Sequence, residues 1–279
     1  MNKYLSILVF AILTSYSISQ EAANKKIQAG LTIGAGLNFT NPTTKFISRN
    51  GVGTDLTVGM NFNYNYTPTI GFSSGIEFDF ETIKLKTDSS LYYVYNDSEI
   101  LTKSQYSDET DIFTSNTGKV YKIKERKLKP IYLTIPTMFL FRTEFIGYFR
   151  YFGKFGLRNS FLLGNTIFDT GGEVVGNPKN TPSPLKNENM KSSQRDLAFY
   201  KGAIGISGGT EWNFSGTTSL VFELGYYYGF LNISRGSALT GDEEKNMSVI
   251  SGFNNNQPIK YTSLPAKQDQ LLLKVSILF

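Results

Sequence analysis

Two sets of charged residues have a spacing that supports chemistry inside a β-structure. The acidic set alternates with apolar residues, so its side chains share one face of a strand at intervals of about 6.5–7 Å, close enough to share a cation: Glu77, Asp79 and Glu81. The basic set shares a face of a later run at four-residue spacing: Arg150, Lys154 and Arg158. Two interpretations remain open. Either the three bases meet the three acids across a narrow interior and neutralise them in a buried ionic network, or the acids belong to a path for protons or ions.

Composition excludes several kinds of chemistry. The 279 residues include no His and no Cys, so disulfides, thiolate metal sites and imidazole-dependent nucleophilic catalysis are absent. We predict no catalytic residues, cofactor or metal, and therefore a non-enzymatic protein. The net charge of +5 is spread along the chain without a basic stripe, which argues against nucleic-acid binding.

Eight runs of alternating apolar and polar residues position these charged groups. In the first run, every odd position from Ile27 to Phe39 is apolar, and the even positions are Gln, Gly, Thr or Asn. Such alternation predicts strands with two different faces. The runs are 27–39, 55–66, 70–81, 131–141, 149–163, 202–214, 220–231 and 270–279.

The two faces differ in charge. The apolar face carries no Asp, Glu, Lys or Arg in any of the eight runs. The opposite face holds six acids, Asp55, Glu77, Asp79, Glu81, Glu211 and Glu223, and six bases, Arg142, Arg150, Lys154, Arg158, Lys201 and Lys274. Runs of about 10 residues suit tilted strands that cross a bilayer, where only a closed barrel satisfies every backbone group. The sequence predicts an all-β, eight-stranded antiparallel up-and-down transmembrane β-barrel with lipid outside and the ions inside a lumen filled by side chains.

The connections between runs support this topology. Short turns at 67–69, 143–147 and 215–217 alternate with long segments at 40–51, 87–129, 164–200 and 232–266. We expect the short turns and both termini on the periplasmic side and the long loops outside the cell. The acidic first half and basic second half of 87–129 favour either a hairpin that extends the third and fourth strands or a mobile, solvated loop. The Pro-containing segment 164–200 is expected to be flexible.

The N-terminus is typical of an export signal. Residues 1–19 combine Lys3, an apolar run and a small-residue cleavage site at Ser17 to Ser19, which leaves 20–279 as the barrel domain. The predicted location is the outer membrane of a Gram-negative cell, with outer-membrane lipid as the first partner. The long loops are expected to meet an extracellular ligand, or an envelope or secretion protein.

Several short motifs make the sequence resemble the PorT-like outer-membrane β-barrel proteins of Bacteroidetes-type bacteria. They are Tyr132-Leu133-Thr134-Ile135-Pro136, the set Gly205, Gly209 and Glu211, the run Tyr228-Gly229-Phe230-Leu231-Asn232-Ile233, and terminal Phe279. The family often has an inward Glu where this chain has Thr134. The resemblance implies an outer-membrane barrel, and the family member linked to secretion and gliding implies a secretion role as an alternative.

Three functions follow from these observations. The first is a non-enzymatic outer-membrane barrel that presents its long loops for envelope organisation or partner binding. The second is a narrow transport component or protein-secretion accessory. The third is a soluble exported barrel with reversed faces that binds an apolar ligand inside.

Overall fold

The computed structural model describes most of the chain after the N-terminal segment. The described residues are 25–87, 91–96, 99–101, 119–173, 186–192, 197–213, 215, 218–234, 249–251, 261–262 and 264–279. The predicted signal segment 1–19 therefore lies outside them. Within these ranges, no helix is long and apolar enough to cross a membrane.

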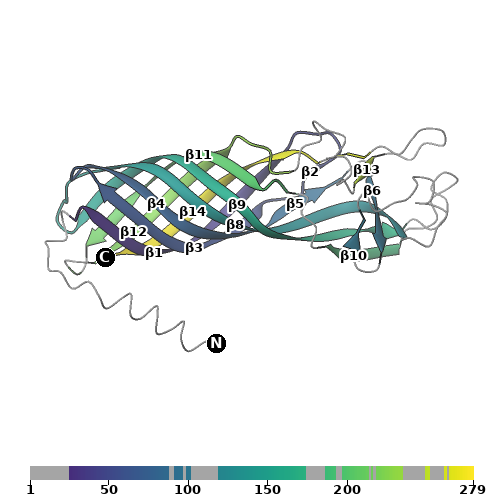
Figure 1. Cartoon of the computed structure of the whole chain (residues 1–279), viewed down its shortest axis with the longest axis horizontal. Helices are drawn as coiled ribbons and strands as arrows, with labels where there is room; N and C mark the ends of the chain where they lie inside the picture. Colours follow the sequence, from purple (N-terminus) through teal and green to yellow (C-terminus); the bar gives the residue numbers. More distant parts are fainter. Residues whose placement is uncertain are drawn as a thin grey trace, which may run out of the picture.

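Eight antiparallel strands close into a ring, which confirms the predicted fold (Figure 1). Each ring strand is hydrogen-bonded to its neighbours in chain order, and β14 pairs with β1 to close the barrel. The ring strands are β1 Ile27–Pro42, β3 Gly53–Asn65, β4 Ile70–Glu81, β8 Lys119–Arg142, β9 Phe149–Glu173, β11 Tyr200–Asn213, β12 Ser219–Gly229 and β14 Ala266–Leu278.

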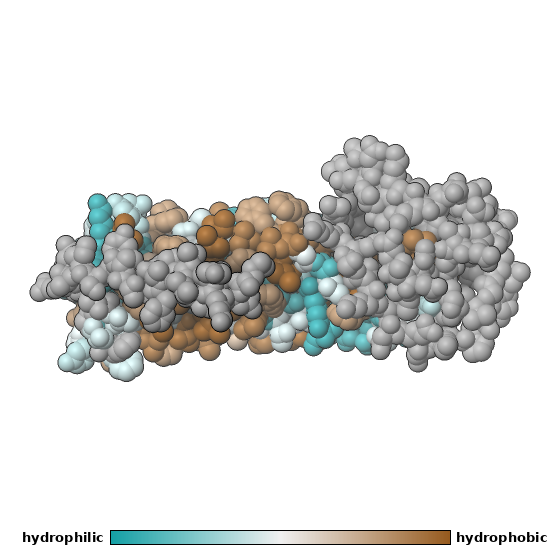
Figure 2. All heavy atoms as spheres, turned by 60° about the horizontal axis from the view of Figure 1, so that its bottom comes forward, coloured by the Kyte–Doolittle hydropathy of each residue, from teal (hydrophilic) through white to brown (hydrophobic). Residues whose placement is uncertain are grey.

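The two faces of the strands lie as predicted. Along β1, the odd-numbered residues point outward and are exposed or half-buried, whereas most of the even-numbered residues are buried inside. Figure 2 shows the result as an apolar surface over one half of the cylinder on the face in view. Because ions lie inside and apolar groups outside, the alternative of a soluble barrel with reversed faces is wrong.

Short turns and aromatic residues mark one end of the barrel, which we assign to the periplasmic side because the turns of outer-membrane barrels are short there. Described residues Thr67 to Thr69 connect β3 to β4, and Gly147, with φ of +65°, lies in the turn between β8 and β9. The rings of Phe149 and Trp212 stack at this end with centroids 6.1 Å apart. The C-terminus lies at the same end (Figure 1), as the up-and-down topology requires.

The opposite end extends far beyond the apolar band. β8 and β9 have 24 and 25 residues, about twice what a tilted strand needs to cross a bilayer. Six short strands join them in the outer part of the molecule (Figure 1). These are β2 Ser48–Arg49, β5 Ile83–Lys86, β6 Leu91–Asn96, β7 Glu99–Ile100, β10 Lys186–Ser192 and β13 Ile250–Ser251.

This extension corrects one loop prediction and supports another. The expectation of a flexible segment over 164–200 is wrong for residues 164–173 and 186–192, which form the end of β9 and β10. Residues 167–173 pair with 186–192. The two halves of 87–129 do pair, with Tyr92 of β6 opposite Lys122 of β8. The acids at 88, 97, 108, 109 and 111 that motivated a charge-paired hairpin lie outside the described residues.

Two β-bulges explain why periodicity alone missed the full length of β8 and β9. The register shifts by one residue at Lys124 on β8 and at Leu163 on β9. Beyond Leu163 the buried positions change from even to odd numbers, so Ile167 and Asp169 still point inward. A bulge adds one residue to one strand, which reverses the alternation without ending the strand.

An apolar core fills the outer half of the barrel above the charged lumen. It draws on residues from β5, β6, β8, β9, β14 and the outer loops, and its lower members Tyr132 and Leu162 border the charged lumen. Its buried members are Ile47, Ile83, Leu85, Leu91, Tyr93, Tyr121, Ile123, Leu128, Tyr132, Leu162, Ile167, Leu197, Ile233, Val249 and Ala266. Burial of these side chains stabilises the extension as a folded part of the protein.

Candidate functional site: a charged network inside the barrel

The predicted charged residues all point into the lumen. Alternation along the ring strands places them there, and all but Lys154, which is half-buried, are buried. Lys201, on β11, belongs to the same set. The predicted lumen residues are Asp55, Glu77, Asp79, Glu81, Arg142, Arg150, Lys154, Arg158, Glu211, Glu223 and Lys274.

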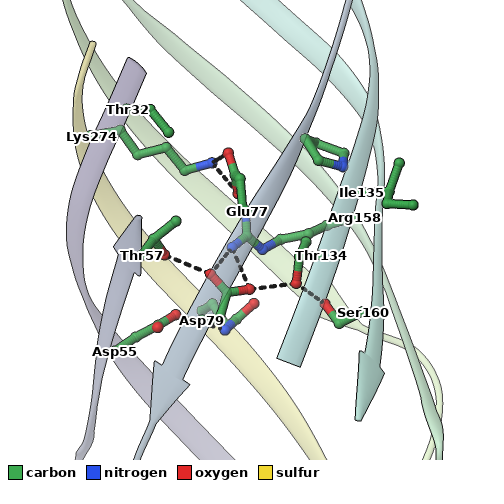
Figure 3. Close-up of polar contacts among 12 residues, drawn as sticks. Thr32, Asp55, Thr57, Glu77, Asp79, Thr134, Ile135, Arg158, Ser160 and Lys274 are labelled. Carbon is green, nitrogen blue, oxygen red and sulfur yellow. Dashed lines mark hydrogen bonds and ion pairs between the residues drawn. The ribbon is translucent and has the colours of Figure 1, made fainter. Parts of the chain in front are cut away.

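Arg158 on β9 forms the centre of the network (Figure 3). Its guanidinium contacts Glu77 Oε2 at 2.6 Å and Asp79 Oδ1 at 2.7 Å, although β8 separates β9 from β4. On the other side, Lys274 Nζ donates to Glu77 Oε1 at 2.7 Å. The two acids therefore receive two full positive charges in the middle of the lumen, where unpaired ions would be costly.

Hydroxyl groups complete the shell around Asp79. Thr57 Oγ1 donates to Asp79 Oδ1 at 2.7 Å, and the Thr134 hydroxyl donates to Asp79 Oδ2 at 2.5 Å. Thr134 is also hydrogen-bonded to Ser160 at 2.8 Å (Figure 3). Each partner comes from a different strand, so the network ties the wall of the barrel together across its interior.

A second group of contacts lies toward the outer end of the lumen. Lys201 Nζ donates to Glu81 Oε1 at 2.5 Å, and Gln268 Nε2 donates to Glu81 Oε2 at 3.0 Å. Gln270 Nε2 lies 2.8 Å from Glu81 Oε1 and 3.0 Å from Asp55 Oδ2. Asp55 is directly opposite Glu81 in the strand register, and its Oδ1 has no hydrogen-bond partner within the described part of the chain.

The remaining charged residues pair toward the periplasmic end. Arg150 makes a bidentate contact with Glu211, its register neighbour, at 2.7 and 2.8 Å. Lys154 Nζ lies 2.6 Å from Glu223. Arg142 donates to the side-chain oxygen of Asn65 at 2.8 Å.

These pairs correct the predicted pairing in detail. The sequence suggested that Arg150, Lys154 and Arg158 together meet the acidic set of β4, but only Arg158 does so. Strand tilt and stagger decide which residues meet across a barrel, and neither can be predicted from the spacing of residues along one strand.

Large side chains also occupy the lumen, although the charge pattern of the sequence did not single them out. Tyr227 is buried, and its ring centroid lies 5.3 Å from the Arg158 guanidinium carbon and 5.9 Å from Lys274 Nζ. Its ring fits because Gly205 and Gly225 leave space, since a Cβ at either glycine would collide with it. The glycines on the inward face were the sequence signal for this packing, because Gly205 stands opposite Tyr227 in the strand register.

A further buried ion pair holds the extension. Arg126 on β8 contacts Asp169 on β9 through three hydrogen bonds of 2.7 to 3.2 Å. Both residues lie in segments that the sequence predicted to be loops, 87–129 and 164–200. The bulge at Leu163 is the reason, because it turns Asp169 inward against the expected alternation.

The lumen thus presents a packed and internally paired polar core. Arg158, Tyr227 and Tyr132 are among the largest fully buried side chains in the described ranges. Across those ranges, no group of three or more acidic residues has the geometry of a metal site. The paired charges and hydrogen bonds of the lumen stabilise the closed barrel.

Comparisons with solved structures found outer-membrane proteins of low similarity. Ail, the attachment invasion locus protein of Yersinia pestis, has 10% identity and a TM-score of 0.32, with 91% of this chain and 100% of that chain covered. A major outer membrane protein from Thermus thermophilus has 14% identity and a TM-score of 0.34, with 91% and 99% covered. The Escherichia coli outer membrane protease OmpT has 9% identity and a TM-score of 0.34, with 95% and 99% covered.

The family assignment comes from the sequence. No curated protein matches the chain significantly. A family model described as the outer membrane protein beta-barrel domain matches residues 17–235, which include seven of the eight ring strands. The chain belongs to this family of outer-membrane β-barrels.

Proposed function

We propose that this protein is a non-enzymatic outer-membrane barrel with a closed lumen, whose folded extracellular extension binds a partner or ligand. The single observation that carries the proposal is the continuous filling along the barrel axis. Charged pairs centred on Arg158 occupy the membrane half, and the apolar core around Tyr93 and Ile167 occupies the outer half. Such filling favours a structural lumen over a conduit.

The absence of enzymatic function is part of the proposal. The sequence contains no His or Cys, so acyl transfer with an imidazole base or a thiolate nucleophile has no candidate residues. The lumen carboxylates are bound by Arg, Lys, Thr and Gln side chains. These contacts favour a stabilising role over general acid–base chemistry.

The extension supports the binding role. β8 and β9 carry it well above the membrane, and its own apolar core and the buried Arg126–Asp169 pair give it a defined shape. A rigid scaffold that positions outer loops is the usual arrangement for recognition by a surface protein.

We further propose that the chain is a PorT-like outer-membrane barrel, and the motifs 132–136, Gly205 with Gly209 and Glu211, and 228–233 support this proposal. Thr134 lies where that family often has an inward Glu, and here its hydroxyl serves the Asp79 carboxylate instead. A Glu at this position would add a third acid beside Glu77 and Asp79, which the threonine avoids.

Conductance in planar phosphatidylcholine bilayers tests the closed lumen. We expect the wild-type protein to give no stepwise ion current, because the charged pairs around Arg158 fill the membrane half of the barrel and the apolar core fills its outer half. Stepwise ion current through the wild-type protein would contradict the proposal.

Site-specific photocrosslinking in cells tests the binding role. A photoreactive residue at Lys122 in the extension should give a saturable cross-link, whereas one at the exposed periplasmic-turn residue Tyr148 should not. Gene deletion with measurement of exported proteins separates this role from a secretion accessory. Loss of export without any cross-link at Lys122 would favour the secretion role.

A further inference from the structure

A column of lysines lies on the outer wall of the barrel just above the lipid-facing band. Phe80 and Ile131 are exposed register partners at the outer end of that band. Continuing outward on the same face, Lys129 follows Ile131 on β8, and then Lys127 and Lys84 stand directly opposite each other on β8 and β5. Figure 2 shows hydrophilic surface bordering the apolar band on the face in view.

The pairing of Lys84 with Lys127 is unfavourable in the isolated protein. Like charges directly opposite on neighbouring strands repel each other and destabilise the pairing. Within the described residues, neither lysine has an ion pair, and Lys129 contacts only the ring of Phe168, at 5.0 Å from its centroid. An anion bound between the two lysines would offset their repulsion, so this pair favours anion binding.

The neighbouring strands add no acid at the level of this lysine column. Opposite Lys127 and Lys129 on β9 stand Phe168 and Thr166. Among the side chains that the structure describes on the outer faces of β5, β8 and β9, the acid next to this column is Glu125, which stands opposite Lys86 one step farther from the membrane. The outer wall at Lys84, Lys127 and Lys129 is therefore locally cationic.

The height of the lysines matches the headgroup layer. Each two-residue step along a strand rises about 7 Å, and a tilt near 40° reduces the rise along the membrane normal to about 5 Å. Lys129 and the Lys84–Lys127 pair thus stand about 5 and 10 Å beyond Ile131. The polar layer on each side of a bilayer is about 5–8 Å thick, and long lysine side chains reach into it.

We propose that Lys84, Lys127 and Lys129 form a binding site for the phosphate groups of an outer-leaflet glycolipid. The apolar residues Phe80, Ile131 and Leu163 below the site contact the acyl chains of the same lipid. Amines at headgroup depth above an apolar wall match an amphiphile that carries phosphate, and this chemistry favours a lipid over a soluble anion.

Reconstitution with and without a phosphorylated lipid tests the site. The protein is placed in phosphatidylcholine vesicles, in the same vesicles with a diphosphorylated glucosamine lipid, and in vesicles with that lipid after removal of its phosphates. Urea unfolding is followed by the fluorescence of Trp212, the sole tryptophan. We expect the unfolding midpoint of the wild type to rise only with the phosphorylated lipid.

Variants on β5 and β8 assign the effect to the lysine column. Lys84→Gln with Lys127→Gln should lose most of the rise in midpoint. Lys122→Gln, also on β8 but far above the headgroups, should keep it. Equal rises in the wild type and the double variant would overturn the proposal.

Two further arms separate lipid binding from other causes. Lys84→Glu creates an opposite-charge pair with Lys127. The variant protein should therefore unfold no more readily than the wild type in neutral vesicles, and it should lose the rise in midpoint with the phosphorylated lipid. Inorganic diphosphate added to neutral vesicles should leave the midpoint unchanged. A rise equal to that given by the lipid would identify a free-anion site and overturn the lipid assignment.

Discussion

Arg158 on β9 reaches past the intervening strand β8 and bonds both oxygens of Asp79 on β4, at 2.7 and 2.8 Å. The contact joins strands that do not touch through their backbones. Because both side chains are buried, each ion depends on the other for the interactions that water supplied in the unfolded chain. Substitutions at these residues therefore test how much the lumen network stabilises the barrel.

Replacing Arg158 with methionine should destabilise the protein strongly. The change leaves Asp79 and part of Glu77 without their main countercharge, and breaking a buried pair in this way costs about 3–5 kcal/mol. The measurement is the free energy of unfolding in vesicles, followed through Trp212. A double variant that adds Asp79→Asn should recover part of the loss, and equal losses in the single and double variants would contradict the pairing.

Neutralising Asp55 should have a different effect from neutralising Glu77. Asp55 faces Glu81 across the strand register and receives a hydrogen bond from Gln270, so Asp55→Asn removes a like-charge contact and should leave stability unchanged or higher. Glu77→Gln removes the shared partner of Arg158 and Lys274 and should cost about 3–5 kcal/mol. The two variants are compared by urea unfolding, and the opposite order would refute this account of the lumen.

A charge on the outer wall should be costly at mid-membrane. Leu224 lies in the middle of β12 and is 55% exposed toward lipid, so Leu224→Arg should lose about 2–4 kcal/mol. Tyr148→Arg in the exposed periplasmic turn is the control and should lose little. Similar folding yields for the two variants in vesicles would show that the outward face is assigned wrongly.

The bulge at Leu163 should make that residue dispensable. Its deletion removes the extra residue of β9, and the inward positions on both sides, Leu162 and Asn165, keep their faces. Deleting Leu157, in a regular part of the same strand, shifts one side of β9 by one position and turns apolar side chains into the lumen. Heat-dependent gel mobility should show a folded barrel for the first deletion and none for the second.

The sequence by itself determined the eight membrane strands, their lipid and lumen faces, and the short turns. These features depend on a two-residue period that every transmembrane strand must obey, because one side meets hydrocarbon and the other does not. The positions of Glu77, Lys274 and the other charged residues inside the lumen follow from that period alone.

Only the tertiary structure decided which charges meet, and how far the barrel extends above the membrane. Arg150 pairs with Glu211 and not with the acids of β4, because strand stagger sets the partners across a closed sheet. The bulges at Lys124 and Leu163 carry β8 and β9 into the extension while reversing the alternation that reveals strands in sequence. Such contacts join residues far apart in the chain, so their geometry exists only once the ring has closed.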